Sequence, residues 1–123
     1  MVNNELVEKI SEVKEYVDEN YCRCACEKDM AYRFNIDIRD MQGGFKIIYG
    51  CTISAYINKK RLERLNELIL ETIDNPQIIY YYMHELGFKT ESGFCNFVKR
   101  MTDMTFREYF QFYKENLQHN MKT

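Results

Sequence analysis

The chain has 123 residues, of which 46% are apolar and 29% are charged, with five glycines and one proline. This composition is typical of a single globular domain and excludes a disordered chain. No apolar run approaches the roughly 20 residues of a membrane span, and the amino terminus lacks the pattern of a secretion signal. We therefore expect a cytoplasmic protein that does not enter a membrane.

Charge is unevenly distributed along the chain. The net charge is −2, but residues 1–40 carry 6 basic and 10 acidic side chains, whereas residues 41–123 carry 11 basic and 9 acidic side chains. A negative net charge does not favour nucleic-acid binding over the whole surface. Any DNA-binding face therefore has to be local, beside an acidic first segment.

Five cysteines without a secretion signal indicate free thiols in a reducing compartment. Cys22, Cys24 and Cys26 have a spacing that is not a common zinc pattern, and the chain has only two histidines. We expect packed or loop thiols and no metal, with a thiol or metal sensor as an alternative. Cys51 and Cys95 fall within the predicted helical units and are expected to pack there.

The first part of the chain predicts three helices. Apolar residues recur at helical spacing over 4–20 and again over 27–34. Asp37 is a favourable N-cap for a third helix over 38–49, and Gly50 is well placed to end it. The predicted inward stripe of this third helix is Ile38, Met41, Phe45 and Ile48.

Two glycines lie in the middle of this third helix. Gly43 and Gly44 each cost about 0.5–1 kcal/mol relative to alanine in a helix interior. One interpretation is that the backbone approaches a ligand surface closely at this point. The other is tight packing against a neighbouring helix.

The sequence also predicts helices over the rest of the chain. Thr52 caps a long helix over 53–73, for which Lys59, Lys60, Arg61 and Arg64 predict a basic exposed face. Further helices are expected over 77–86, over 91–102 and over 106–117. No segment alternates like a strand, so the fold class is all-α with about seven helices.

A weak internal repeat has an offset of 53 residues. Lys46, Thr52 and Tyr56 recur as Lys99, Thr105 and Tyr109, Met30 pairs with Met83, and Asp37 with Thr90. The repeated unit is a helix, a tight turn and a capped helix, which is a helix-turn-helix. We expect one domain over 1–123, with a first module over 5–52, a linker helix over 53–73 and a second module over 76–117.

Two stretches resemble a known family. The run from Met41 to Gly50, with its Phe45-Lys46 pair, is followed by the Tyr56–Arg64 stretch. The later run His84-Glu85-Leu86-Gly87-Phe88 precedes Ser92, Phe94, Lys99 and Arg100. Together they resemble the AraC/XylS-type DNA-binding domain over about residues 5–115. The resemblance implies two helix-turn-helix modules that insert recognition helices into successive major-groove segments.

The resemblance also implies DNA contacts. The expected base contacts are Arg39, Gln42 and Gly43 in the first module, and Glu91, Ser92, Gly93 and Asn96 in the second. The expected phosphate contacts are Lys46, Lys59, Lys60, Lys89, Lys99, Arg100 and Arg107. The chain departs from the family pattern in places, for example with Asp103 where a glycine is usual.

These observations lead to one principal hypothesis and one alternative. The first is a sequence-specific transcription regulator that binds double-stranded DNA, with no catalytic constellation and no cofactor. By resemblance it contacts RNA polymerase, and it acts as a monomer or as the output half of a longer dimeric regulator. The alternative is a diverged protein-interaction module without base readout, which the acidic first helix, the Asp37 cap and Glu91 favour.

Overall fold

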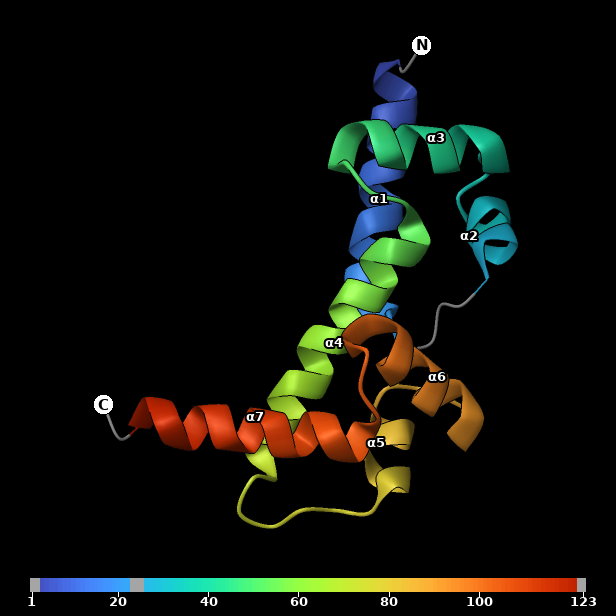
Figure 1. Cartoon of the computed structure of the whole chain (residues 1–123). Helices are drawn as coiled ribbons and strands as arrows, with labels where there is room; N and C mark the ends of the chain where they lie inside the picture. Colours follow the sequence, from blue (N-terminus) through green and yellow to red (C-terminus); the bar gives the residue numbers. More distant parts are fainter. Residues whose placement is uncertain (1–2, 23–25, 122–123) are drawn as a thin grey trace. The chain divides into compact units, whose positions relative to one another are not determined.

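The computed structural model of the chain describes residues 3–22 and 26–121, and every regular element within these ranges is an α-helix (Figure 1). The all-α prediction is therefore confirmed. The helices are α1 (Asn4–Asn20), α2 (Glu27–Arg33), α3 (Ile38–Tyr49), α4 (Ile53–Glu71), α5 (Ile79–Glu85), α6 (Glu91–Thr102) and α7 (Phe106–Met121). They form two compact units, Met1–Arg61 and Leu62–Thr123, whose boundary falls within α4.

The first unit contains α1, α2, α3 and the beginning of α4. Helix α3 packs against both α1 and α2, and it crosses α1 in Figure 1. The core consists of Ile10, Val13, Val17, Met30, Ala31, Met41, Phe45, Ile53 and Ile57. Ile48, predicted to face inward, is 37% exposed because it lies in the last turn of α3, beside the turn at Gly50.

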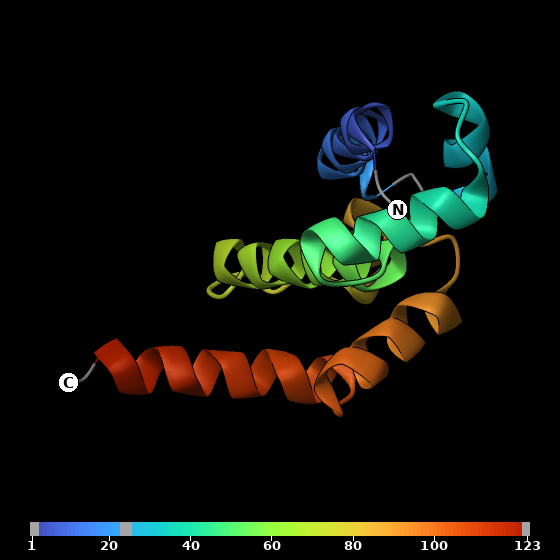
Figure 2. The same cartoon turned by 90° about the horizontal axis from the view of Figure 1, so that it is seen from above.

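The second unit contains the end of α4 with α5, α6 and α7. Helix α6 packs against α5 and α7, and Figure 2 shows α6 leading into α7 through a short turn. The core consists of Leu65, Leu68, Ile69, Tyr82, Leu86, Phe94, Phe97 and Val98. Helix α5 begins two residues later than predicted, because Ile78 is extended and the Gln77 N–H donates to the Tyr82 hydroxyl (3.2 Å). Helix α7 continues past the predicted end at residue 117, since no glycine or proline interrupts it.

Helix α4 contributes to both cores and is more than a connector. Ile53 and Ile57 belong to the first core, and Leu65, Leu68 and Ile69 belong to the second. Amphipathic pattern alone predicts a long helix here, and the two cores explain why both of its ends are stable.

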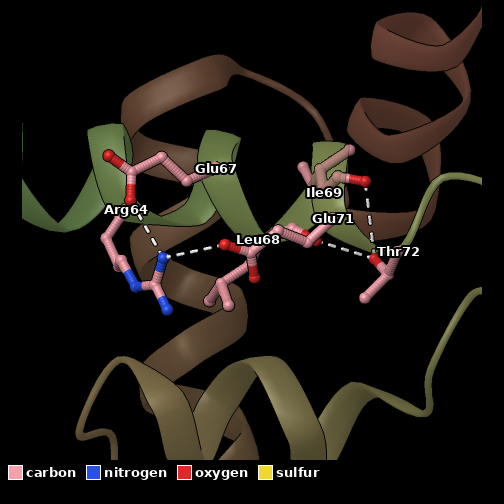
Figure 3. Close-up of polar contacts among 6 residues, drawn as sticks. All are labelled: Arg64, Glu67, Leu68, Ile69, Glu71 and Thr72. Carbon is pink, nitrogen blue, oxygen red and sulfur yellow. Dashed lines mark hydrogen bonds and ion pairs between the residues drawn. The ribbon is translucent and has the colours of Figure 1, made fainter.

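Hydrogen bonds and ion pairs stabilise the last turns of α4 (Figure 3). Buried Thr72 follows the last helical residue, and its hydroxyl donates to the Leu68 carbonyl (2.8 Å) and lies 2.7 Å from the Tyr82 hydroxyl. Arg64 donates to Glu67 (2.9 Å) and also pairs with Glu71 (3.4 Å).

The prediction that α4 has a basic exposed face is largely wrong. Of its four basic residues, Lys59 is exposed, whereas Lys60, Arg61 and Arg64 are half-buried. Arg64 is neutralised by the glutamates on its own helix. The three-residue spacing of Arg64 and Glu67 makes them neighbours on any helix, and an interpretation that considered the basic residues alone missed the pair.

The predicted caps are confirmed for the helices that follow the two tight turns. The Asp37 carboxylate accepts from the Arg39 N–H (2.9 Å), and the Thr90 hydroxyl accepts from the Gly93 N–H (3.0 Å). The Thr52 hydroxyl accepts from the Ala55 N–H (3.1 Å) and so caps α4, as predicted. These side chains satisfy backbone donors that have no partner within the helix.

Residues with positive φ mark equivalent positions in the two units. Asn35 (φ 52°) and Gly87 (φ 80°) lie in the tight turns, and Gly50 (φ 78°) and Asp103 (φ 62°) end α3 and α6. Asp103 thus takes the conformation of the glycine that is usual there, which aspartate tolerates better than most residues.

The backbone hydrogen bonds set the register of the repeat. In the first turn the Ile36 N–H donates to the Ala31 carbonyl (3.0 Å), and in the second the Phe88 N–H donates to the Met83 carbonyl (3.0 Å). Ala31 is therefore the counterpart of Met83, and the predicted pairing of Met30 with Met83 is wrong by one residue. The second turn is one residue longer, so the offset of 53 holds only after the turn.

Candidate nucleic-acid interface

Helices α2 and α3 form the first helix-turn-helix, and α3 holds a continuous exposed face. Arg39, Gln42, Gly43 and Lys46 are all exposed, and their spacing of three and four residues puts them on one side of the helix, opposite its buried stripe. The structure therefore brings these four residues to one exposed side of α3. Ile47, which sequence reasoning did not select, lies on the same face and is 73% exposed.

The two glycines of α3 have different surroundings in the structure. A Cβ at Gly44 would lie 2.1 Å from Cδ1 of buried Ile10, so this glycine is required by packing against α1. A Cβ at Gly43 would meet no atom within 4 Å. Each interpretation offered for the pair therefore applies to one member: Gly44 packs, and Gly43 leaves the helix backbone open to an approaching surface.

Helices α5 and α6 form the second helix-turn-helix. The predicted contacts on and just before α6 are exposed, namely Lys89, Glu91, Ser92, Asn96, Lys99 and Arg100. The Lys99 ammonium donates to the Asp103 carbonyl (3.2 Å) and so also closes the end of α6. The Tyr80 hydroxyl donates weakly to Glu91 (3.4 Å).

The surroundings of two further residues of α6, Gly93 and Cys95, suggest roles that the sequence did not. A Cβ at Gly93 would lie 3.0 Å from the Thr90 hydroxyl that caps the helix, so this glycine has a structural reason within the protein. Cys95 is the counterpart of Gln42 in the repeat and is half-buried. Burial and the charge of Glu91 raise the pKa of the Cys95 thiol. The 53-residue offset, applied residue by residue, is the signal that could have shown Cys95 to be the counterpart of Gln42.

The basic residues outside the recognition helices differ in their surroundings. Lys59 and Arg107 are exposed. Lys60 lies 3.8 Å from Asp18 of α1, so part of its charge is already compensated within the protein.

Asp18 is the centre of a polar cluster between α1 and α4. It accepts hydrogen bonds from the Tyr56 hydroxyl and from the Lys14 ammonium (3.0 Å). Burial raises the pKa of the Asp18 carboxyl, but these hydrogen bonds and the charges of Lys14 and Lys60 outweigh burial and hold the pKa below its usual value. The cluster therefore holds α4 against α1 within the first unit.

The cysteine segment lies only partly within the described residues. Cys22 is half-buried and Cys26 is exposed, whereas Cys24 lies outside the described ranges. Over residues 3–22 and 26–121 no three histidine, cysteine or carboxylate side chains gather in a way that could hold a metal ion. In the same ranges no helix is long and apolar enough to cross a membrane.

The fold and this exposed face together define a double helix-turn-helix domain, and sequence comparison gives the family. The pattern of the helix-turn-helix domain family matches residues 30–111, more than half of the chain. The chain belongs to the AraC/XylS-type helix-turn-helix family of DNA-binding transcription regulators. The resemblance inferred from the sequence is confirmed.

One solved structure supports the fold. The C-terminal domain of AraT, a response regulator from Geobacillus stearothermophilus, is similar with a TM-score of 0.72 and 16% sequence identity, over 88% of this chain and 84% of that chain. At this identity the likeness concerns the fold alone. A comparison with curated protein sequences gives no significant match.

Proposed function

We propose that this chain reads a specific DNA sequence by placing α3 and α6 in two successive segments of the major groove. The observation that carries the proposal is the face of α3: Arg39, Gln42, Gly43 and Lys46 are exposed on one side of a capped helix that follows a tight turn. In a helix-turn-helix this second helix faces the base edges.

The side chains of the first module fit distinct parts of DNA. Arg39 can donate two hydrogen bonds to guanine, and Gln42 can exchange two with adenine. Gly43 lets the helix backbone approach the base edges, and Lys46, one turn further along, binds a phosphate. Lys59 adds a phosphate contact from α4, and Lys60 contributes less because Asp18 compensates its charge.

The second module offers a different surface. Ser92 and Asn96 contact bases, and Glu91 accepts from the amino group of cytosine. The phosphate contacts of this module are Lys89, Lys99, Arg100 and Arg107. Because the two faces differ in chemistry, the two half-sites of the operator should differ in sequence and lie about one helical turn apart.

The test is selection of bound duplexes from a randomised pool at about 50 mM and about 200 mM salt. An enriched motif with two half-sites supports the proposal. Retention that depends on salt without an enriched motif, or no retention at low salt, contradicts it. Arg39→Ala should relax the preference at one position, whereas Arg33→Ala, its match on α2, should change no base preference.

The proposal has consequences for partners and location. A regulator of this kind acts in the cytoplasm on chromosomal DNA and contacts RNA polymerase through surfaces away from α3 and α6. It binds as a monomer, or as the output half of a longer dimeric regulator. Sedimentation of the protein with and without a selected duplex distinguishes one bound chain from two.

One observation favours a second function, a protein-interaction module. Helix α1 carries five exposed glutamates at spacings of three and four residues, which form one acidic face: Glu5, Glu8, Glu12, Glu15 and Glu19. Such a face repels DNA and attracts basic surfaces. If the pool selection retains no DNA at low salt, binding to purified RNA polymerase becomes the decisive measurement.

A further inference from the structure

One exposed side chain of α3 has no role in the contacts proposed above. Ile47 lies in the last third of the helix and is 73% exposed. A single exposed isoleucine is common on protein surfaces. Its position is informative here, because residues four apart lie above one another on a helix. Arg39, Gly43 and Ile47 therefore form one row, which contains two of the proposed base contacts.

Gly43 leaves the surface beside Ile47 uncovered. A Cβ at Gly43 would meet no atom within 4 Å, so neither the Arg39 nor the Ile47 side chain lies over it. Its φ is not positive, and no packing contact requires a glycine there. Side chains on a helix lean towards its amino-terminal end, so Ile47 leans towards the turn that contains Gly43. Together they make an apolar stretch of surface with open space above the backbone.

We propose that Ile47, beside Gly43, contacts the 5-methyl group of a thymine and so sets part of the base preference of the first module. The inference rests on the proposed function. Thymine is the one base that presents an apolar group in the major groove, and apolar side chains recognise it there. Gly43 allows the close approach, Ile47 supplies the apolar contact, and Arg39 and Gln42 hydrogen-bond to other bases.

The test removes the methyl group without changing base pairing. Each thymine of the selected operator is replaced singly by deoxyuridine, and binding is measured by fluorescence anisotropy. The wild-type chain should lose about three- to fivefold in affinity at one position, as expected for one methyl group leaving an apolar contact. Cytosine at that position should bind better when it is replaced by 5-methylcytosine.

Matched variants assign the effect to Ile47. Ile47→Ala should bind the thymine and deoxyuridine operators equally, because the contact is gone from both. Ile48→Ala, its less exposed neighbour, and Lys46→Ala should lower stability or overall affinity but keep the wild-type ratio between the two operators. Ile47→Val should retain most of the discrimination.

The outcomes separate the two proposals. If the pool selection finds no motif, the proposed function fails and this inference fails with it. If a motif is found but every deoxyuridine operator binds as well as its thymine parent, the proposed function stands and the role of Ile47 is refuted. The same holds if Ile47→Ala keeps the wild-type discrimination.

Discussion

Alanine substitutions at the two adjacent glycines of α3 should have opposite effects on stability. Both replacements remove the entropic cost of a glycine in a helix interior, a gain of about 0.5–1 kcal/mol. At Gly43 nothing lies within 4 Å of the new Cβ, so Gly43→Ala should stabilise the protein by about this amount. At Gly44 the new Cβ would lie 2.1 Å from Cδ1 and 3.5 Å from Cγ1 of Ile10.

The cost at Gly44 follows from the packing of the first core. Ile10 is fully buried, so it has to leave its rotamer or push α1 away from α3. Overpacking of this kind costs about 1–3 kcal/mol. Because the gain in helix propensity is common to both variants, the difference between them measures the overpacking directly and should also be about 1–3 kcal/mol, with Gly44→Ala the less stable.

Urea unfolding followed by circular dichroism gives the two free energies. Hydrogen exchange of peptides from α1 assigns the change to the first unit, since each unit has its own core. Equal stabilisation by both variants would refute the packing argument, because it would mean that Ile10 accommodates the methyl group at no cost. Destabilisation by Gly43→Ala would show that this position is not open. The stabilised Gly43→Ala variant should nevertheless bind DNA more weakly, since its Cβ occupies the place of close approach.

The remaining predictions concern DNA binding and the polar contacts. Arg39→Ala should cost about 1–3 kcal/mol on the selected operator and relax one position, measured by anisotropy on single-base variants. Lys99→Ala should weaken binding to all sequences alike and reduce the salt dependence, whereas Lys114→Ala, its control on α7, should not. The lowered pKa of Asp18 means that its contribution to stability is present above the usual aspartate pKa and is lost as pH falls through the lowered value. The free energy of unfolding, measured in urea at a series of acidic pH values, should therefore fall less steeply with falling pH in Asp18→Asn than in the wild type. An equal pH dependence in the two proteins would contradict this. Tyr82→Phe should destabilise the second unit by about 1–3 kcal/mol, because the Gln77 N–H and the Thr72 hydroxyl lose a buried partner; hydrogen exchange of α4 and α5 checks it.

Local features of the sequence predicted much of the fold. N-cap side chains such as Asp37 and Thr90 and the helix-ending Gly50 act through bonds to their own neighbours, so their effects can be read without knowing the fold. The periodicity of apolar residues identified the buried stripes of α1 and α3 for the same reason. Where a stripe reached a helix end, as at Ile48, the pattern could not tell the core from its edge.

Surface chemistry was harder to predict, because it depends on contacts between distant parts of the chain. The pattern that marked Lys60 as an exposed cation is correct for a bare helix. Asp18, which partly compensates Lys60, comes from α1, 42 residues earlier in the chain. A pairing over that separation exists only once α1 and α4 are packed together.

The sequence by itself determined the all-helical class and the positions of the helices that follow the two tight turns, because capping and periodicity are local properties of the chain. The family came from the resemblance of two stretches to the AraC/XylS type. Only the tertiary structure decided between the two explanations for the glycines of α3. Gly43 and Gly44 are identical in sequence terms and occupy the same helix. They differ in the direction in which a side chain would point, towards Ile10 of α1 or away from the protein, and that difference appears only when α3 lies against α1.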